Sequence, residues 1–266
     1  MMGKAIFQFL VMALVFFAAW FALSRIDYVK KFHLTGISRK TEKKIGDFIM
    51  NTLERTKKEV KSDSAQVILD KLKTRLCNAN AIDEKDIHVH LLEEGDVNAF
   101  ALPGNHLVIY TGLIKHADSA SELCGVMAHE IGHMQLNHVM KRLGGELGIT
   151  VLASIVTNGN SQVAGEAIKI LSSSAFERGQ ETEADKYAVG CLIRAHINPA
   201  GMTNFMMKIA KMQSGIPEEM EWISSHPDSK KRAEAIRALY ENETYYSEPV
   251  ITEEEWATLK RAAKPD

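Results

Sequence analysis

Cysteine is scarce in this chain, with three residues in 266, at Cys77, Cys124 and Cys191. They are widely spaced, form no Cys-x-x-Cys pair and are odd in number, which argues against a disulfide framework. They do not indicate a thiol nucleophile either. We expect them to be small buried side chains within helices.

Charge of either sign is not in excess, because 32 Lys and Arg stand against 34 Asp and Glu and the net charge is -2. No basic patch supports a role in binding nucleic acid, so no nucleic-acid partner is expected. Internal repeats and a tetratricopeptide signature are missing as well, which excludes a repeat array for partner binding. With 45% hydrophobic and 25% charged residues, the composition indicates one soluble catalytic domain plus an anchor.

One long hydrophobic run is present, at residues 5–23, which contain no charge and one strongly polar residue, Gln8. A helix of this length spans about 28 Å, enough for the hydrocarbon core of a bilayer. Trp20 and Phe21 interrupt the small residues that a signal-peptide cleavage site would need. We therefore predict an uncleaved transmembrane anchor that contacts the lipid bilayer through residues 5–23.

The charges that flank this run bear on orientation. Lys4 precedes it, whereas Arg25, Lys30 and Lys31 follow it. The positive-inside rule taken alone then favours a cytoplasmic domain, although long domains can be translocated despite that bias.

The segment "MAHEIGHMQLNH", residues 127–138, contains three histidines and a glutamate. In a helix, residues four apart share a face, so His129 and His133 point together. Glu130 is rotated by about 100° and can reach a water on a metal held by the pair. This is the His-Glu-x-x-His pattern of zinc hydrolases, in which a catalytic zinc has three protein ligands and leaves the fourth position to water. One ligand is still missing.

His138 is not the expected third ligand. It lies five residues after His133, where a continuing helix would point it away from the pair. The extended metzincin pattern would need Gly and His where this chain has Leu136 and Val139. We expect His138 to be a capping or hydrogen-bonding residue late in the helix.

A second helix is predicted at residues 176–196, "FERGQETEADKYAVGCLIRAH". Glu181 and Asp185 are four apart and share a face, and Ala184 beside them would allow a close approach to the first helix. Glu181 can then bind the metal, while Asp185 can accept a hydrogen bond from a ligand imidazole. The alternative is a solvated acidic face, which we prefer for Glu177 and Glu183.

Four segments occur in an order that resembles one family. They are "NAFALPGNHLVIYTGLI" (98–114), "HEIGHMQLNH" (129–138), "RGQETEAD" (178–185) and "HPDSKKR" (226–232). The chain is similar, over roughly residues 65–240, to the HtpX-like and CAAX-prenyl-protease-type zinc metallopeptidases, a gluzincin family. The resemblance implies one zinc ion per chain. It makes Glu181 the third ligand beside His129 and His133, and places Asp185 at the last position of the family's Glu-x-x-Ala-Asp motif. Glu177 departs from the family, which usually has Ser there, and this leaves the local contacts of Arg178 open.

The first of these segments predicts a β-hairpin around a Pro-Gly-Asn turn, with residues 98–102 as an edge strand. In the family the matching strand is a substrate-docking edge, which makes Asn98, Ala99, Phe100 and Ala101 candidate substrate-binding residues. An extended peptide could pair with such a strand through its main chain. The alternative is an ordinary sheet edge.

His226 precedes Pro227 and a helix predicted to begin near Asp228, which suits an N-cap. In the family the matching His and Arg lie at the active site, which makes His226 and Arg232 candidate catalytic residues. Either could stabilise the oxyanion of a tetrahedral intermediate. His226 could instead bind zinc in the resting state and act as a latch, or it could be a surface histidine at a helix start.

Further elements are predicted by periodicity: amphipathic helices at residues 38–60 and 64–76, a strand at 87–93, a helical hairpin at 146–176 that covers the cleft, and a helix at 251–264. His88 and His90 share a strand face and are expected to be exposed polar residues rather than a second metal site.

The fold class we predict is α+β and mostly helical, a zincin-type metallopeptidase domain with a small β-sheet plus an N-terminal transmembrane helix. The expected division is 1–25 as the anchor, 26–64 as a juxtamembrane helical segment, 65–245 as the zinc metallopeptidase domain and 246–266 as a helical tail.

These features predict a membrane-anchored zinc endopeptidase that hydrolyses peptide bonds of unfolded or misfolded proteins, with Glu130 as the general base. Anchored family members with exported domains favour the extracytoplasmic, periplasmic side, and substrates among membrane or envelope proteins. A different class of function is a membrane-tethered, zinc-binding holdase with little turnover. The intact Glu130 argues against it, since structural zinc sites need no base.

Overall fold

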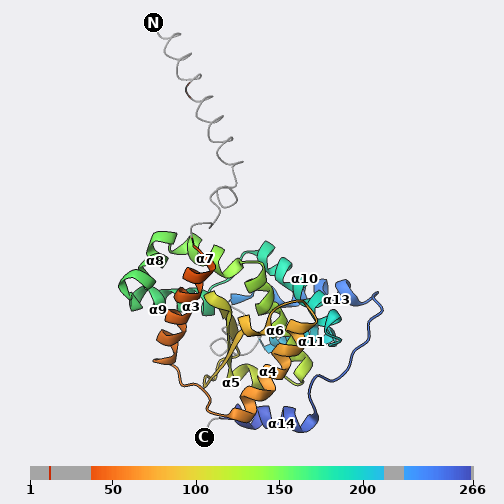
Figure 1. Ribbon diagram of the computed structural model, residues 1–266. Helices are drawn as coiled ribbons and strands as arrows, with labels where there is room; N and C mark the ends of the chain where they lie inside the picture. Colours follow the sequence, from red (N-terminus) through yellow and green to blue (C-terminus); the bar gives the residue numbers. More distant parts are fainter. Residues whose placement is uncertain (1–11, 13–36, 213–224, 265–266) are drawn as a thin grey trace. The chain divides into compact units, whose positions relative to one another are not determined.

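The computed structural model describes residues 37–212 and 225–264, together with Met12 (Figure 1). The predicted anchor at residues 5–23, apart from Met12, and the first part of the predicted juxtamembrane segment lie outside the described residues. Within the described part of the chain, no helix combines the length and the apolar character needed to cross a bilayer.

A three-stranded sheet lies at the centre, with strand order β1-β3-β2. Strands β2 (Ala99–Leu102) and β3 (His106–Tyr110) form the predicted antiparallel hairpin, while β1 (His88–Leu92) pairs with β3 in parallel. The turn η2 (Pro103–Asn105) joins the hairpin, and Gly104 in it has a φ of 71°, a left-handed conformation that favours glycine. As predicted, β2 is an outer strand of the sheet formed by the described residues.

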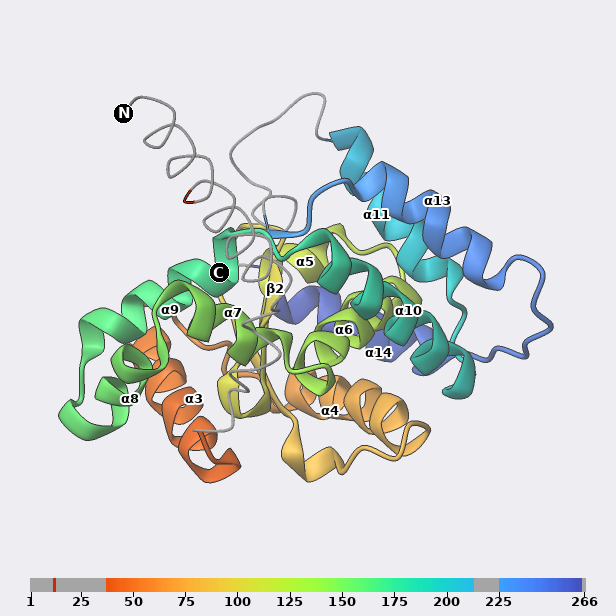
Figure 2. The same cartoon turned by 90° about the horizontal axis from the view of Figure 1, so that it is seen from above.

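Two helices in contact form the core next to the sheet, α6 (Ala120–Gln135) and α10 (Arg178–Arg194) (Figure 2). Helix α6 is buried from its third residue almost to its end, and it also contacts β2 and β3. A Cβ added to Gly132 of α6 would lie 3.2 Å from the backbone oxygen of Ala184 in α10. The small residues of both helices therefore bring the two backbones close together, as the sequence predicts for Ala184.

Three helices form a separate group beside the sheet: α3 (Arg39–Glu54) contacts both α8 (Ile149–Asn158) and α9 (Ser161–Ser173), and α9 also contacts β2 (Figure 2). The two helices predicted within residues 146–176 are thus confirmed as α8 and α9, whereas their covering of the cleft stays a prediction. The break between these helices falls at Gly159, whose φ is 60°, and the side chain of Asn160 caps α9 by accepting the N–H of Val163.

The remaining helical elements are α4 (Asp63–Asn78), η1 (Glu84–Asp86), α5 (Thr111–His116), α7 (His138–Glu146), α11 (Ala200–Met212), α13 (Ser229–Tyr240) and α14 (Glu253–Ala262). Helix α14 matches the predicted C-terminal helix and contacts α4 and α5. Its Lys260 donates hydrogen bonds to the backbone oxygens of Lys115 and Ala117.

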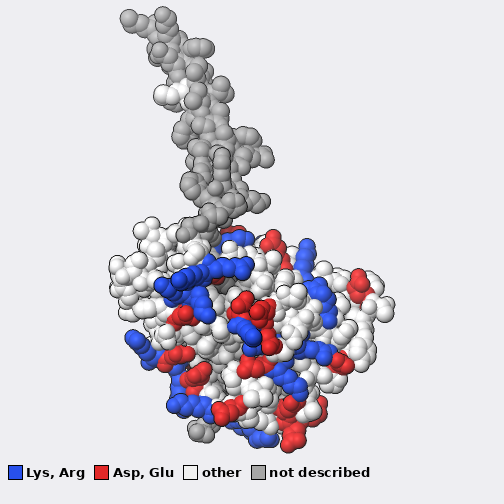
Figure 3. Space-filling view, viewed as in Figure 1, with Lys and Arg blue, Asp and Glu red and all other residues white. Residues whose placement is uncertain are grey.

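The predicted fold class is confirmed in its coarse form, because the described residues are mostly helical around one small sheet. All three cysteines are free and buried, as expected. On the face drawn in Figure 3, basic and acidic side chains of the described residues lie interspersed.

Candidate active site

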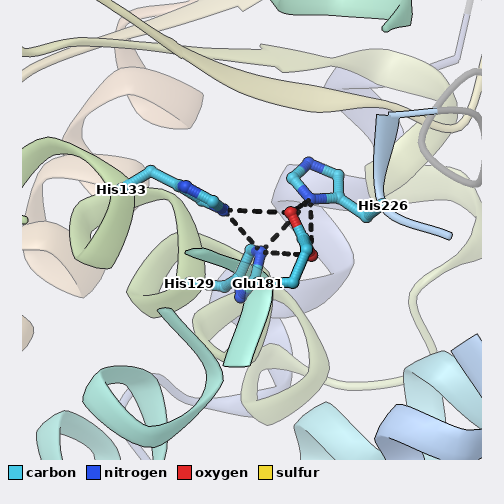
Figure 4. A group of neighbouring side chains, drawn as sticks. All are labelled: His129, His133, Glu181 and His226. Carbon is cyan, nitrogen blue, oxygen red and sulfur yellow. Dashed lines mark hydrogen bonds and ion pairs between the residues drawn. The ribbon is translucent and has the colours of Figure 1, made fainter. Parts of the chain in front are cut away.

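Helix α6 supplies two imidazoles to one point. The helix begins after Ser119, whose hydroxyl accepts the N–H of Glu122 and caps the first turn. One turn apart within the helix, the Nε2 atoms of His129 and His133 lie 3.1 Å from each other, and both side chains are fully buried (Figure 4).

Helix α10 adds a carboxylate from its first turn. The oxygens of Glu181 lie 3.5 Å from His129 Nε2 and 3.4 Å from His133 Nε2, and the residue is 2% exposed. The start of this helix is held by the side chain of Gln180, which accepts the N–H of Glu177. The structure therefore brings together the three residues expected to bind zinc.

His226, from the segment before α13, completes the group (Figure 4). Its Nδ1 lies 2.9 Å and 3.1 Å from the two oxygens of Glu181 and 3.3 Å from His129 Nε2. The expectation that His226 caps this helix is wrong, because Asp228 is the N-cap residue, in a left-handed conformation with φ 63°. His226 instead lies before the helix and is fully buried.

The donor set fits a zinc ion. Ligand atoms of His129, His133, Glu181 and His226 all lie within 4.8 Å of one another. Atoms that share a tetrahedral zinc at about 2.1 Å are about 3.4 Å apart, close to the separations given above. Three imidazole nitrogens and a carboxylate that converge in a buried position place several lone pairs close together, and a cation between them would balance these.

Glu130 faces the same cluster and is fully buried. Its Oε1 lies 3.3 Å from His226 Nε2, and within the described residues neither carboxylate oxygen has a hydrogen bond of good geometry. Burial would raise the pKa of Glu130, but the neighbouring His226 outweighs it and holds this pKa below its usual value. An ionised carboxylate next to a metal site is the form that a general base requires.

Asp185 connects the cluster to α13. Its Oδ1 lies 3.0 Å from His129 Nδ1, and Arg232 donates to both of its oxygens, at 2.9 Å from Nε and 2.6 Å from Nη2. Arg232 also forms an ion pair with Glu181. Burial would lower the pKa of His129, but the contacts with Asp185 and Glu181 raise it to about 9. These contacts fix the orientation of the His129 ring.

His138 is close to the cluster but outside the ligand set. Helix α6 ends at Gln135, and Asn137 has a φ of 60°, so His138 begins α7 instead of lying late in the first helix as expected. Its Nδ1 is 3.1 Å from His133 Nδ1, and its Nε2 is 3.1 Å from Glu183. The expected hydrogen-bonding role is thus seen, and Glu183, expected to be only solvated, has a partner.

Phe176 was not anticipated from the sequence. Its ring stacks on the His133 ring at a centroid distance of 4.0 Å and an interplanar angle of 26°, and the guanidinium of Arg142 lies 4.5 Å from the Phe176 centroid. The burial of the His133 imidazole and, to a smaller extent, the charge of the neighbouring His129 lower its pKa to about 4.

The proposed substrate-docking residues lie in β2 and just before it. Asn98 is fully buried and donates from Nδ2 to the backbone oxygen of Ser172 in α9, at 2.9 Å. Ala99, Phe100 and Ala101 are buried as well, and none of the four belongs to the metal-ligand cluster. The side chain of Asn98 thus holds α9 against the sheet edge.

Beside Glu181, a cavity of about 260 Å³ lies between α10 and α13. Its polar wall includes Glu181, Asp185 and Arg232, and its apolar wall includes Ile236 and Leu239. Arg178, whose local contacts the sequence left open, also lines it and is 3.7 Å from Asp228.

His88 and His90 on β1 are half-buried, which corrects the expectation that they are exposed. Burial, with His106 and His88 as further causes, lowers the pKa of His90 to about 4. The imidazole of His90 is therefore neutral at neutral pH.

Comparison with known proteins gives the family. A model of Peptidase family M48 matches residues 61–240, more than half of the chain. The chain is 32% identical over 173 residues to Metalloprotease LoiP of Escherichia coli (strain K12), which covers 62% of this chain and 68% of that protein. It is 28% identical over 217 residues to the Beta-barrel assembly-enhancing protease of Yersinia pestis, covering 74% of this chain and 44% of the relative.

The mitochondrial metalloendopeptidase OMA1 of Bos taurus is 26% identical over 180 residues, which cover 61% of this chain and 34% of that protein. The chain thus spans less than half of the length of two of these relatives. The matched region contains the histidine pair, Glu181 and His226, whose buried donor atoms fit a zinc ion. The chain therefore belongs to Peptidase family M48, a family of zinc metallopeptidases, in agreement with its sequence motifs.

Proposed function

We propose that the chain is a membrane-anchored zinc endopeptidase that hydrolyses peptide bonds of unfolded or misfolded polypeptides. One observation carries this proposal. The buried side chains of His129, His133 and Glu181, which can bind zinc, lie beside the ionised carboxylate of Glu130, whose oxygens have no hydrogen bond of good geometry within the described residues. A structural zinc site would need no such base next to it.

A zinc ion held by His129, His133 and Glu181 supplies Lewis-acid chemistry to a hydrolysis. Glu130 accepts the proton of the attacking water and later delivers it to the nitrogen of the leaving amine. No side chain has to form a covalent bond to the substrate, in keeping with the three buried cysteines.

Asp185 and Arg232 act as positioning residues in this proposal. Asp185 orients His129 through Nδ1, and Arg232 is engaged by both Asp185 and Glu181. With its guanidinium so engaged, Arg232 serves to fix the ligand carboxylate, whereas the sequence had also suggested an oxyanion-stabilising role.

His226 acts as a resting-state ligand in the same proposal. Its Nδ1 lies among the other three donors, so four protein groups surround the site in this conformation. A catalytic zinc keeps one position open for water, so His226 has to leave before hydrolysis begins. The segment that carries it comes directly before α13, at whose start Asp228 is in a left-handed conformation.

Strand β2 is the proposed docking edge for substrate main chain. Its outer position in the sheet and its contact with α6, the helix of the histidine pair, support this. Ala99, Phe100 and Ala101 are at most 2% exposed in this conformation, so docking requires that the strand be uncovered first. Pairing through the backbone of residues 99–101 would accept many sequences, as a protease of unfolded chains requires. Asn98 then has a structural role, since its amide binds the backbone of α9.

Membrane attachment rests on residues 5–23, whose uncharged length suits a bilayer. The relatives include a protease named for enhancing β-barrel assembly, which supports substrates among envelope proteins. An extracytoplasmic, periplasmic location of the catalytic domain is part of this proposal.

The test compares the full chain in detergent with its Glu130→Gln variant, measuring bound zinc and cleavage of unfolded casein. We expect zinc in both and cleavage only by the parent chain. Cleavage that persists in Glu130→Gln would refute the role of this base.

A second candidate is supported by the four-residue donor set, which is typical of closed, structural zinc sites. In that case the chain is a zinc-stabilised holdase that binds unfolded segments with little turnover. His226→Ala separates the two if the parent is inactive, because a latched peptidase gains cleavage in this variant and a holdase does not.

A further inference from the structure

A second group of potential metal ligands lies away from the cluster that contains Glu181. It consists of Glu54 at the end of α3, Glu59 in the segment that follows, and His90 in the middle of β1. Their ligand atoms lie within 4.8 Å of one another, with His90 Nδ1 at 3.9 Å from Glu54 Oε1 and 3.8 Å from Glu59 Oε1.

A chain of contacts behind His90 determines which of its nitrogens carries the proton. Asp47 Oδ1 lies 3.1 Å from His106 Nε2, and His106 Nδ1 lies 2.9 Å from His90 Nε2. Because the carboxylate accepts from Nε2–H, a neutral His106 can only accept at Nδ1, and His90 must then donate from Nε2. The free lone pair of His90 is therefore on Nδ1.

The lone pair on His90 Nδ1 faces the carboxylates of Glu54 and Glu59. All three groups are hydrogen-bond acceptors, so none can donate a proton to another. The gaps of 3.8 and 3.9 Å are too long for a hydrogen bond from a protonated Nδ1. They suit a cation placed between the atoms, because two ligands that share a metal at about 2.1 Å lie up to about 4.2 Å apart.

Neighbouring lysines make other ion pairs. Lys57 pairs with Glu94 and Lys58 pairs with Glu93, although both lysines lie between Glu54 and Glu59 in the sequence. No ion pair between a lysine or arginine and Glu54 or Glu59 is found within the described residues. The negative charge of this pair is thus left for another cation to balance.

We propose that Glu54, Glu59 and His90 form a second metal site that binds a divalent transition-metal ion, with His106 and Asp47 orienting the imidazole. One nitrogen and two carboxylate oxygens suit Zn²⁺ or Mn²⁺, whereas Ca²⁺ takes six or more oxygens. The side chains of Glu54, Glu59 and His90 are 37%, 48% and 16% exposed, so an ion can enter from solvent and water can complete its coordination.

Such an ion would join the end of α3, the segment that follows it and strand β1. Glu59 forms an isolated β-bridge with Leu92, the last residue of β1, and Glu54 is the last residue of α3. The bound metal would therefore fasten the end of α3 to the sheet and raise the stability of the folded chain.

Metal content tests the proposal directly. The full chain in detergent, carrying no histidine tag, is equilibrated with micromolar free Zn²⁺ and its zinc is counted by mass spectrometry. We expect two zinc ions per chain in the parent and one in the double variant Glu54→Gln with Glu59→Gln. The control His88→Ala, whose ring also lies on β1 near His106, should keep two. One ion in the parent, or two in the double variant, would overturn the second site.

The orienting contacts are tested by Asp47→Asn, which replaces a half-exposed side chain and should not impair folding. We expect the second ion to bind about 10- to 100-fold more weakly, with the first unaffected. An unchanged affinity would refute the orienting role. Casein cleavage and the first zinc ion are measured in the same samples, so failure of the peptidase proposal and failure of this site are recorded separately.

Discussion

The two groups of histidine and carboxylate side chains are built in opposite ways. In the first, His129, His133, Glu181 and His226 are at most 2% exposed. In the second, Glu54 and Glu59 are 37% and 48% exposed at the side chain. Burial excludes water that would compete for the ion and keeps each donor in one orientation. The first site should therefore hold zinc far more tightly and exchange it more slowly than the second.

The largest expected effect is the loss of one buried imidazole. His133→Ala should weaken zinc binding and reduce casein cleavage to the uncatalysed level, because only His129 and Glu181 would hold the ion once His226 has left. Zinc content and cleavage rate are the measurements.

His90→Ala is the matched control, since it removes an imidazole from β1 and should leave cleavage unchanged. Equal loss of cleavage in both variants would show that the exposed group around His90 also affects catalysis, and that the two groups are not independent.

The next effect comes from forcing apart the helices that hold the buried donors. A Val side chain at Gly132 would collide with the backbone of Ala184, 3.2 Å from the added Cβ. We expect Gly132→Val to lower the free energy of unfolding by about 1 to 3 kcal/mol. It should also weaken zinc binding. Urea denaturation measures the first effect.

Gly165→Val in α9 provides the reference, because a Cβ there has no atom within 4 Å. Its change in unfolding free energy should be below about 0.5 kcal/mol. Equal losses in both variants would show that the close contact of α6 and α10 is not the cause.

A smaller effect is expected behind the ligands. Asp185→Asn keeps the size of the side chain but removes the charge that faces His129 Nδ1, so zinc affinity should fall about 10- to 100-fold. Competition with a chelator measures it. An affinity within the error of the parent would show that the ring is oriented without this carboxylate.

The smallest effect is expected at Glu183, which contacts His138 and through it His133. Its side chain is 63% exposed, so solvent weakens this contact. Glu183→Gln should change zinc affinity less than about twofold, measured in the same competition assay. A loss of zinc affinity as large as that of Asp185→Asn would show that the exposed contact of Glu183 matters as much as the buried contact of Asp185.

Local spacing in the sequence predicted the elements that depend on neighbours along the chain. The four-residue interval placed His129 and His133 on one helix face, and the Pro-Gly-Asn turn located the hairpin of β2 and β3. The parallel pairing of β1 with β3 was not predicted, because no short-range pattern encodes which strands meet. The end of α6 was also missed, since the left-handed Asn137 interrupts a pattern that could have continued.

Within the site, long-range contacts set the limit. The family motifs drew attention to Glu181 and His226, but the sequence could not choose among the roles of His226. Phe176 carries no motif, and its stacking on His133 depends on how the segment before α10 folds back. His90 and Glu54 are far apart in sequence, which is why the strand pattern alone suggested ordinary polar residues.

Asp185 has a consequence that concerns the whole domain. It binds His129 of α6 on one side and Arg232 of α13 on the other, and Arg232 in turn binds Glu181. The carboxylates of Asp185 and Glu181 thus contact both the metal-binding group and α13, so zinc binding and the docking of α13 are coupled. Because such coupling is reciprocal, the free energy by which bound zinc stabilises the docking of α13 equals the free energy by which docked α13 stabilises zinc binding. A substrate or partner that pulled on α13 would thereby alter the metal affinity without touching the metal.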